Sequence, residues 1–442
     1  MRPTMFDQLL TSLADAGRDL LRGRLGNRRK SIDALCRSLL STRGDASGAA
    51  LARELVETYR SMAEQDRLAF LETLARDYGP VPDAIQAAVE AYREAPGPET
   101  LSRLRSTTEP PRQELFRRMN MAPGGTRALL ALRQELLGYL PDHPQLREVD
   151  ADLHHLLASW FNPGFLTLTR IDWNSPAALL EKLLRYEKVH KMQALEDLKR
   201  RLAPDRRCFA FFHPALPDEP LIFVQVALVE GMASRVGPLI DAETPATPAR
   251  SADTAIFYSI SNCQDGLRGV TLGNFLIKLV VASLQDELPH LRTFATLSPI
   301  PGFAAWLEAE LALEESDVIG AQERPLLRRL LTPGWPGDEA FVEQVKPLLM
   351  RLCSHYLVRE KRGSRPRDPV ARFHLGNGAR LERINWLGDA SPKGLRESFG
   401  LLVNYGYDTG HIERNHETFV NTGEVVHASS VRRLLPPLHQ DA

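Results

Sequence analysis

Apolar side chains recur every three to four positions along the first 150 residues, which is the spacing of amphipathic helices. Within residues 52–92 the repeat includes Leu55, Tyr59 and Met62, and a second stretch follows at residues 129–140. β-Branched residues are scarce there, and prolines fall at the breaks between repeats. This pattern predicts an all-α helical bundle over residues 1–158.

The pattern changes from residue 159 onward, where short apolar runs alternate with helical repeats. Strands are predicted at residues 208–213, 221–229, 255–261, 293–297 and 380–387. Helices are predicted at residues 177–191, 274–288, 303–313, 341–358 and 392–405. The second domain, residues 159–442, is therefore expected to be a mixed α/β domain, which makes the whole chain α+β.

Composition argues against several classes of protein: nucleic-acid-binding, membrane-bound, zinc-binding and disulfide-rich. The 442 residues carry 55 Lys plus Arg against 56 Asp plus Glu, a neutrality that gives no support to nucleic-acid or anionic-membrane binding. The four cysteines show no CxxC spacing, which argues against a zinc site or a disulfide framework. The sequence contains neither an apolar run of transmembrane length nor a secretory h-region, so we expect a cytoplasmic protein with no membrane partner.

A glycine-marked loop at residues 264–274 joins a predicted strand to a predicted helix. Amides at a helix N-terminus carry partial positive charge, and a pyrophosphate suits them, with Arg268 as an additional cation. The loop matches neither the Walker nor the Rossmann pattern. Glycines at such turns also serve packing alone, so both interpretations remain open at this point.

Two polar residues stand out further along the chain. Ser298 is expected at the end of a strand, followed by prolines; without a GxSxG motif, it suits a hydrogen-bonding role better than a nucleophilic one. His374 is expected in a loop beside Gly376 and Gly378, where backbone can approach a ligand. A lone histidine is more often structural than catalytic, so the residues alone leave both roles open.

Five segments together resemble the malonyl-CoA decarboxylase family. They are CFAFFHPALPDEPLIFVQVAL, FYSISNCQDGLRGVTLGNFLIK, LSPIPGF, FHLGNGARLERINW and GLLVNYGY. The resemblance covers nearly the whole chain. It implies an N-terminal helical oligomerisation domain, giving a homodimer or homotetramer, and a catalytic domain with the GNAT-type N-acetyltransferase fold.

The resemblance also implies roles for particular residues. Ser298 corresponds to the active-site serine and His374 to the proton donor, while Ser259 and Tyr407 correspond to polar residues lining that site. The implied CoA-binding loop consists of Arg268, Gly269, Val270, Thr271, Leu272, Gly273 and Asn274. Thr271 stands where the acetyltransferase pattern expects a glycine, so the local turn must suit a residue with a side chain.

The activity that the resemblance implies is conversion of malonyl-CoA to acetyl-CoA and CO2 by a carbon–carbon lyase. We expect backbone amides to stabilise the enolate and His374 to supply the proton, with no metal, no biotin and no cofactor beyond the CoA of the substrate. Two alternatives remain: an acyl-CoA-dependent acyltransferase on the same fold, and a non-enzymatic CoA-binding scaffold.

Overall fold

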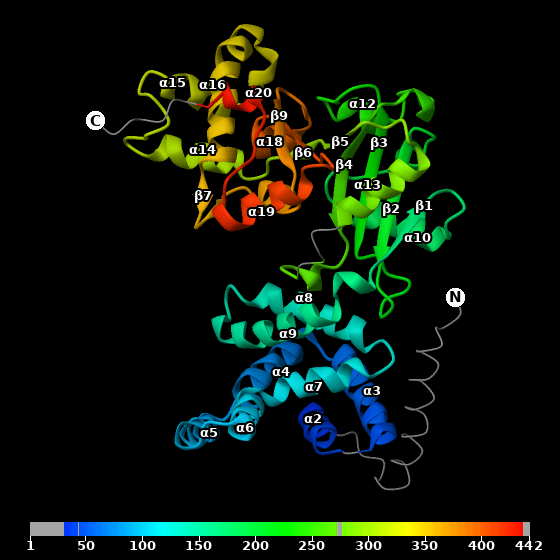
Figure 1. The fold of residues 1–442 in the computed structure, drawn as a ribbon, viewed down its shortest axis with the longest axis vertical. Helices are drawn as coiled ribbons and strands as arrows, with labels where there is room; N and C mark the ends of the chain where they lie inside the picture. Colours follow the sequence, from blue (N-terminus) through cyan, green and yellow to red (C-terminus); the bar gives the residue numbers. More distant parts are fainter. Residues whose placement is uncertain (1–30, 43, 271, 273–275, 436–442) are drawn as a thin grey trace. The chain divides into compact units, whose positions relative to one another are not determined.

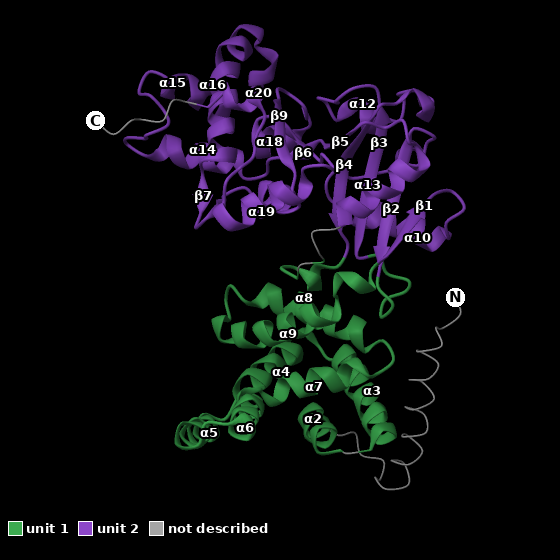
Figure 2. Ribbon diagram, viewed as in Figure 1, with its two compact units in different colours: residues 1–166, 213–220, 264–272 green, residues 167–212, 221–263, 273–442 purple. Residues whose placement is uncertain are grey.

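The computed structural model describes residues 31–42, 44–270, 272 and 276–435. By its internal contacts the chain forms two compact units (Figure 2). The first contains residues 1–166 together with two later segments, 213–220 and 264–272, and the second contains the remainder. The helical unit thus runs slightly past the expected boundary at residue 158 and includes the loop between β2 (Arg206–Phe212) and β3 (Ile222–Val229) and the loop between β4 (Thr254–Asn262) and α13 (Leu276–Glu287).

Helices build the first unit, as the apolar spacing predicts (Figure 1). They are α2 (Ile32–Ser41), α3 (Asp45–Ser61), α4 (Glu64–Asp77), α5 (Pro82–Glu94), α6 (Pro98–Thr108), α7 (Pro111–Asn120), α8 (Gly125–Tyr139) and α9 (Arg147–Trp160). Proline occupies the first turn of α5, α6 and α7, where its missing amide hydrogen would have no helical acceptor.

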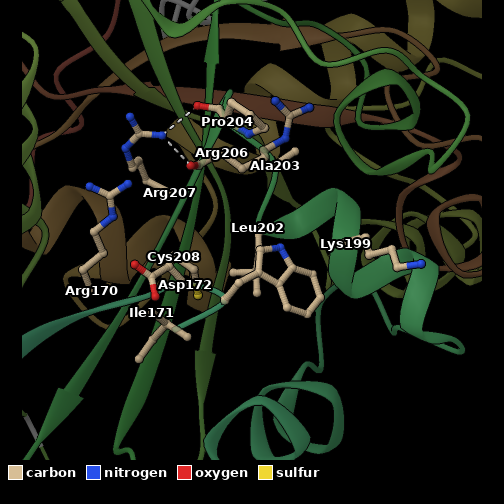
Figure 3. Close-up of a pocket in the computed structure, with 11 residues that line it drawn as sticks. Arg170, Ile171, Asp172, Lys199, Leu202, Ala203, Pro204, Arg206, Arg207 and Cys208 are labelled. Carbon is tan, nitrogen blue, oxygen red and sulfur yellow. Dashed lines mark hydrogen bonds between the residues drawn. The ribbon is translucent and has the colours of Figure 1, made fainter. Parts of the chain in front are cut away.

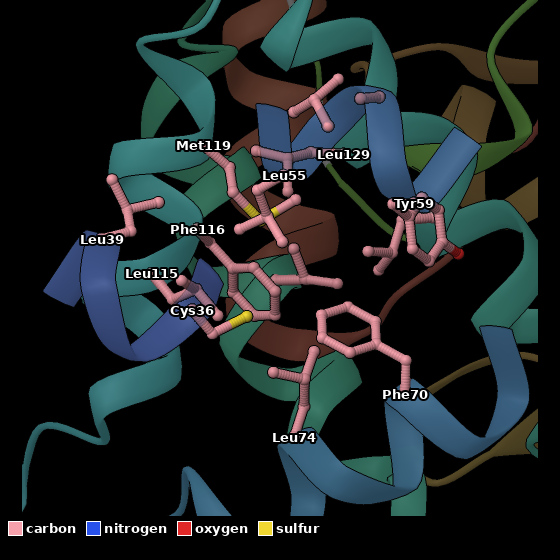
Figure 4. Close-up of a cluster of buried hydrophobic side chains, with 14 of the residues drawn as sticks. Cys36, Leu39, Leu55, Tyr59, Phe70, Leu74, Leu115, Phe116, Met119 and Leu129 are labelled. Carbon is pink, nitrogen blue, oxygen red and sulfur yellow. The ribbon is translucent and has the colours of Figure 1, made fainter. Parts of the chain in front are cut away.

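The core of the helical unit is apolar and draws on most of these helices (Figure 4). Leu55 of α3, Phe70 of α4, Phe116 of α7 and Leu129 of α8 are buried in one cluster. Burying a side chain of this size typically stabilises a fold by about 1.5–3 kcal/mol. The helical repeat in the sequence therefore marks the residues that hold the bundle together.

An eight-stranded sheet forms the centre of the second unit, in the order β1-β2-β3-β4-β5-β10-β6, with β9 paired to β10. Its strands are β1 (Thr167–Ile171), β2 (Arg206–Phe212), β3 (Ile222–Val229), β4 (Thr254–Asn262), β5 (Thr293–Thr296), β6 (Ser298–Pro299), β9 (Arg380–Asn385) and β10 (Leu402–Gly406). β4 and β5 are parallel and the other pairs are antiparallel. A separate two-stranded ribbon joins β7 (Lys361–Arg362) to β8 (Arg365–Pro366).

Helices precede, connect and follow these strands (Figure 1). They are α10 (Ala177–Tyr186), α11 (Leu195–Arg201), α12 (Gly237–Ile240), α13 (Leu276–Glu287), α14 (Phe303–Ala312), α15 (Arg324–Arg328), α16 (Glu339–Val358), α17 (Pro369–Gly376), α18 (Pro392–Ser398), α19 (Ile412–Thr422) and α20 (Ser429–Arg432). The expected order of an all-α bundle followed by a mixed α/β domain is confirmed.

One predicted helix is wrong over its second half. The expected helix at 392–405 ends at Ser398, and residues 402–406 form strand β10. Phe399 and Gly400 adopt left-handed backbone conformations with φ of 52° and 79°, which end the helix. The run from Leu402 to Tyr405 is apolar enough for either element, and pairing with β5, β6 and β9 makes it a strand.

Candidate active site

Ser298 begins a short strand, whereas the sequence suggested that it ends one. β6 is the two-residue strand Ser298–Pro299, and Ser298 lies opposite Val403 of β10. Proline is compatible with this position because β6 is at the end of the strand order, where one edge needs no partner. The Ser298 side chain is buried, with 5% of its surface exposed.

His374 lies in a helix, and its predicted loop position is wrong. Helix α17 begins after Asp368, whose Oδ1 accepts from the amide of Ala371 at 2.8 Å, and Pro369 is its first residue. An acidic cap followed by proline is a helix-start signal, so the sequence did contain the information. His374 is in the last turn and only 3% exposed.

The structure joins Ser298, His374 and Tyr407 in one hydrogen-bonded chain. Ser298 Oγ lies 3.0 Å from His374 Nε2, and the opposite ring nitrogen, Nδ1, lies 2.8 Å from the Tyr407 hydroxyl. Ser298 Oγ also donates to Thr296 Oγ1 at 2.8 Å. One neutral tautomer satisfies every contact: Tyr407 donates to Nδ1, and the Nε2–H donates to Ser298.

Burial sets the protonation of this group. Desolvation lowers the pKa of His374 to about 3 and raises the pKa of Tyr407 well above its ordinary value. The Tyr405 ring stacks on the imidazole with centroids 4.7 Å apart, so the histidine has an aromatic neighbour on one face. At neutral pH the site therefore holds a neutral imidazole, which has one donor and one acceptor nitrogen.

Thr296 is a member of this network that sequence reasoning missed. It is fully buried, its Oγ1 also accepts from the amide of Tyr405 at 3.2 Å, and its carbonyl accepts from Asn404 Nδ2 at 2.7 Å. Thr296 lies two positions before Ser298, so the two side chains can share one side of the chain. The sequence alone does not show that both hydroxyls join one hydrogen-bond network. Thr296 fixes the hydroxyl of Ser298 against β10.

A buried carboxyl group lies close to the same network. Asp368 is fully buried, and desolvation raises its pKa to about 6, although the amides of Ala371, Val370 and Gly302 act in the opposite direction. Burial raises the pKa of Tyr405, and the negative charge of Asp368 raises it further. Among the described residues neither Asp368 Oδ2 nor the Tyr405 hydroxyl has a hydrogen-bond partner.

Ser259 belongs to a different cluster. Its Oγ lies 2.9 Å and 2.7 Å from the two carboxylate oxygens of Glu187, and Ser261 Oγ reaches the same carboxylate at 3.2 Å. The amides of Val189 and His190 also donate to Glu187. Glu187 is buried just after α10, at a position that the sequence predicted to be helical, and no motif pointed to it.

The implied CoA loop is only partly described. Thr271, Gly273 and Asn274 lie outside the described residues. Arg268, Gly269, Val270 and Leu272 follow a short 3₁₀ turn at Asp265–Leu267 and group with the helical unit. Gly269 has φ of 81°, a left-handed conformation that favours glycine.

A cavity of about 400 Å³ opens beside β1 and β2, and none of the predicted site residues line it (Figure 3). Two of its cations, Arg170 and Arg207, share the carboxylate of Glu287 at 3.1 Å and 2.7 Å. Arg207 also donates to the carbonyls of Pro204 and Arg206. Because Glu287 and backbone carbonyls already bind these two guanidinium groups, an anion in the cavity would gain little from them.

Family models match both parts of the chain. Residues 164–442 match the malonyl-CoA decarboxylase C-terminal domain, and residues 78–161 match the malonyl-CoA decarboxylase N-terminal domain. The chain belongs to the malonyl-CoA decarboxylase family. The family resemblance expected from the five sequence segments is thereby confirmed.

Individual relatives agree with this membership. The mitochondrial malonyl-CoA decarboxylase of Anser anser anser is 37% identical over 422 residues, covering 88% of this chain and 84% of the relative. The crystal structure of malonyl-CoA decarboxylase from Rhodopseudomonas palustris is 51% identical, with a TM-score of 0.88 over 91% of this chain and 98% of that one. The structure from Agrobacterium vitis is 47% identical, with a TM-score of 0.87 over 92% and 99%.

In the part of the chain that the structure describes, no helix combines the length and apolar character needed to cross a membrane. The expected cytoplasmic location stays a prediction, because the curated relatives are mitochondrial proteins.

Proposed function

We propose that the protein converts malonyl-CoA to acetyl-CoA and CO2 as a carboxy-lyase. The observation that carries this proposal is the buried chain from Tyr407 through His374 to Ser298, in a member of the malonyl-CoA decarboxylase family. A histidine held at both ring nitrogens is suited to delivering a proton at a fixed position.

The reaction needs a stabilised enolate and one proton. Cleavage of the bond between the carboxylate and C2 releases CO2 and moves the electron pair into the thioester, which delocalises it without metal or biotin. C2 then takes a proton, for which His374 Nε2 is the proposed donor. Positioned general acids typically contribute on the order of 10²- to 10⁴-fold in rate.

The low pKa of His374 is compatible with this role. Burial keeps the imidazole neutral, because desolvation lowers its pKa. A malonyl carboxylate bound beside the ring would favour the imidazolium and raise that pKa. His374 would then take up one proton from solvent when substrate binds, and transfer of that proton to C2 would return the imidazole to its neutral form.

Ser298 and Tyr407 have complementary roles in this proposal. Ser298 orients the malonyl carboxylate or the proton network, and Tyr407 occupies Nδ1 so that Nε2 carries the hydrogen. Backbone amides near Ser298 and the CoA loop are proposed to stabilise the enolate oxygen, an effect typically worth about 3 kcal/mol per donor. Ser259, whose hydroxyl binds Glu187, is proposed to line the site without joining the chain from Tyr407 to Ser298.

An acceptor-free assay tests the proposal. The purified protein is given malonyl-CoA alone, after treatment with EDTA and with avidin, and the products are quantified. We expect stoichiometric acetyl-CoA and CO2 with undiminished rate after both treatments. Unchanged thioester that is consumed only when an amine or alcohol is added would favour an acyltransferase, and CoA binding without any turnover would favour a scaffold.

Self-association through the helical unit is a further part of the proposal. Light scattering on the full chain would give the mass, and we expect a homodimer or homotetramer. A monomer at micromolar concentration would remove oligomerisation from the role of this unit.

A further inference from the structure

The loop at residues 264–270 lies between β4 and α13 in sequence but packs with the helical unit (Figure 2). Gly266 lies directly against α8: a Cβ atom there would be 2.2 Å from the carbonyl oxygen of Leu130. Leu267 and Val270 are buried. Only glycine permits this approach, so the loop and the helix are fitted to one another.

Arg133 of α8 holds this loop by its backbone. The guanidinium is 2% exposed, and its Nη1 donates to the carbonyl oxygens of Gly266 at 2.7 Å and Arg268 at 2.9 Å. Its Nε donates to Asp150 Oδ1 at 2.8 Å, which compensates the buried charge. A buried cation with two backbone acceptors fixes the direction in which both carbonyls point.

A third carbonyl of the loop is bound in the same way. His154 of α9 lies with Nε2 3.1 Å from the carbonyl oxygen of Gly269, and since a carbonyl can only accept, the ring nitrogen donates. Donors of the helical unit therefore bind the carbonyls of residues 266, 268 and 269. A loop that binds a phosphate must direct its amides to the anion and its carbonyls away from it.

We propose that Arg133 is a positioning residue for the coenzyme A part of the substrate: by holding the carbonyls of Gly266 and Arg268, it keeps them turned away from the pyrophosphate. His154 supports it at Gly269. This inference rests on the proposed function, because it takes the loop as the binding site of the CoA pyrophosphate. It gives the helical unit a part in substrate binding, in addition to packing and self-association.

The test compares two thioesters that differ in the pyrophosphate. Arg133→Met removes the donors but keeps a long side chain, Arg133→Lys restores one donor, and Arg127→Met is the matched control on the exposed face of the same helix. Each protein is assayed with malonyl-CoA and with malonyl-pantetheine, which lacks the nucleotide and its phosphates. Thermal unfolding of each variant is recorded in parallel.

For Arg133→Met we expect KM for malonyl-CoA to rise about 10-fold or more with kcat changed less than about 3-fold. The kcat/KM for malonyl-pantetheine should change less than about 2-fold, Arg133→Lys should recover part of the loss, and Arg127→Met should match the wild type. Equal losses on both thioesters, or an unchanged KM for malonyl-CoA, would overturn the inference.

A second variant protects the test against a folding defect. His154→Leu removes a donor at a partly exposed site. We expect its KM to rise about 3-fold for malonyl-CoA and to stay unchanged for malonyl-pantetheine. If Arg133→Met does not fold, an unchanged KM for malonyl-CoA in His154→Leu overturns the inference. If the wild type has no decarboxylase activity, the proposed function fails by itself. Calorimetric affinity for CoA, compared between wild type and Arg133→Met, then decides the role of Arg133: equal affinities, or no binding by either protein, would refute it.

Discussion

Ser298 Oγ and His374 Nε2 lie 3.0 Å apart although 76 positions separate the two residues. Strand β10 brings them together, since Val403 pairs with Ser298 and Tyr407, which follows the same strand, binds the other nitrogen of the imidazole. Strand β10 thus positions the serine and the tyrosine, and helix α17 places the histidine between them. Substitutions in this group should separate chemistry from binding.

His374→Asn should lower kcat at least about 100-fold, because it removes the proposed proton donor. The affinity for CoA should stay within about 2-fold, since the CoA loop is not altered. Steady-state assays and calorimetry measure the two effects. His290→Asn, at an exposed histidine whose Nε2 donates to the carbonyl of Ala249, is the matched control and should behave as wild type. Near-normal turnover in His374→Asn would remove this residue from the mechanism.

Much of the fold could be predicted from the sequence because local patterns determine it. The hairpin of β2 and β3 and the helices of the first unit follow from apolar spacing within single elements. Strand β10 could not be recognised, because the run from Leu402 to Tyr405 has no pattern of its own and depends on its partners. Ser298 and His374 could be selected as candidates, but their contact is tertiary.

Three further buried residues could not be selected from the sequence for the same reason. Thr296, Glu187 and Arg133 are ordinary residues of a strand, a helix end and a helix, and no motif marks them. Their importance lies in buried hydrogen bonds to segments far away in the sequence. A single sequence without structure contains no measure of such bonds.

Tyr407→Phe and Tyr405→Phe form a matched pair of buried tyrosine substitutions. Tyr407→Phe leaves Nδ1 of a buried imidazole without its donor, which should cost about 1–3 kcal/mol of unfolding free energy and lower kcat roughly 10-fold. Tyr405→Phe removes a hydroxyl that has no partner among the described residues, so stability should stay equal or rise. Urea unfolding and kcat measure both. Comparable destabilisation by the two variants would mean that the Tyr405 hydroxyl has a partner such as a buried water.

Ser259→Ala and Ser261→Ala distinguish packing from function on β4. Both hydroxyls bind the buried carboxylate of Glu187, so each variant should lose about 1–3 kcal/mol of unfolding free energy. Because only Ser259 is expected to line the active site, kcat/KM should fall about 10-fold in Ser259→Ala and little in Ser261→Ala. Equal kcat/KM in the two variants would limit Ser259 to a structural role with Glu187.

The buried neutral state of His374 makes stability depend on pH in a predictable direction. Its folded pKa of about 3 lies below the ordinary value of 6.5, so its contribution is fully present above pH 6.5 and is lost as pH falls toward 3. Between pH 7 and pH 4 this amounts to roughly 3 kcal/mol of unfolding free energy.

The raised pKa of Asp368, about 6, has the opposite sign, because its contribution is present below pH 4 and is lost as pH rises through 6. Asp368 is present in both the wild type and His374→Asn, so the difference between their unfolding free energies removes its effect. Urea titrations at pH 7, 6, 5 and 4 should show the wild type losing its advantage over His374→Asn as pH falls. A difference that stays constant across this range would contradict a buried, neutral His374, and with it the proposal that His374 takes up its proton from solvent when substrate binds.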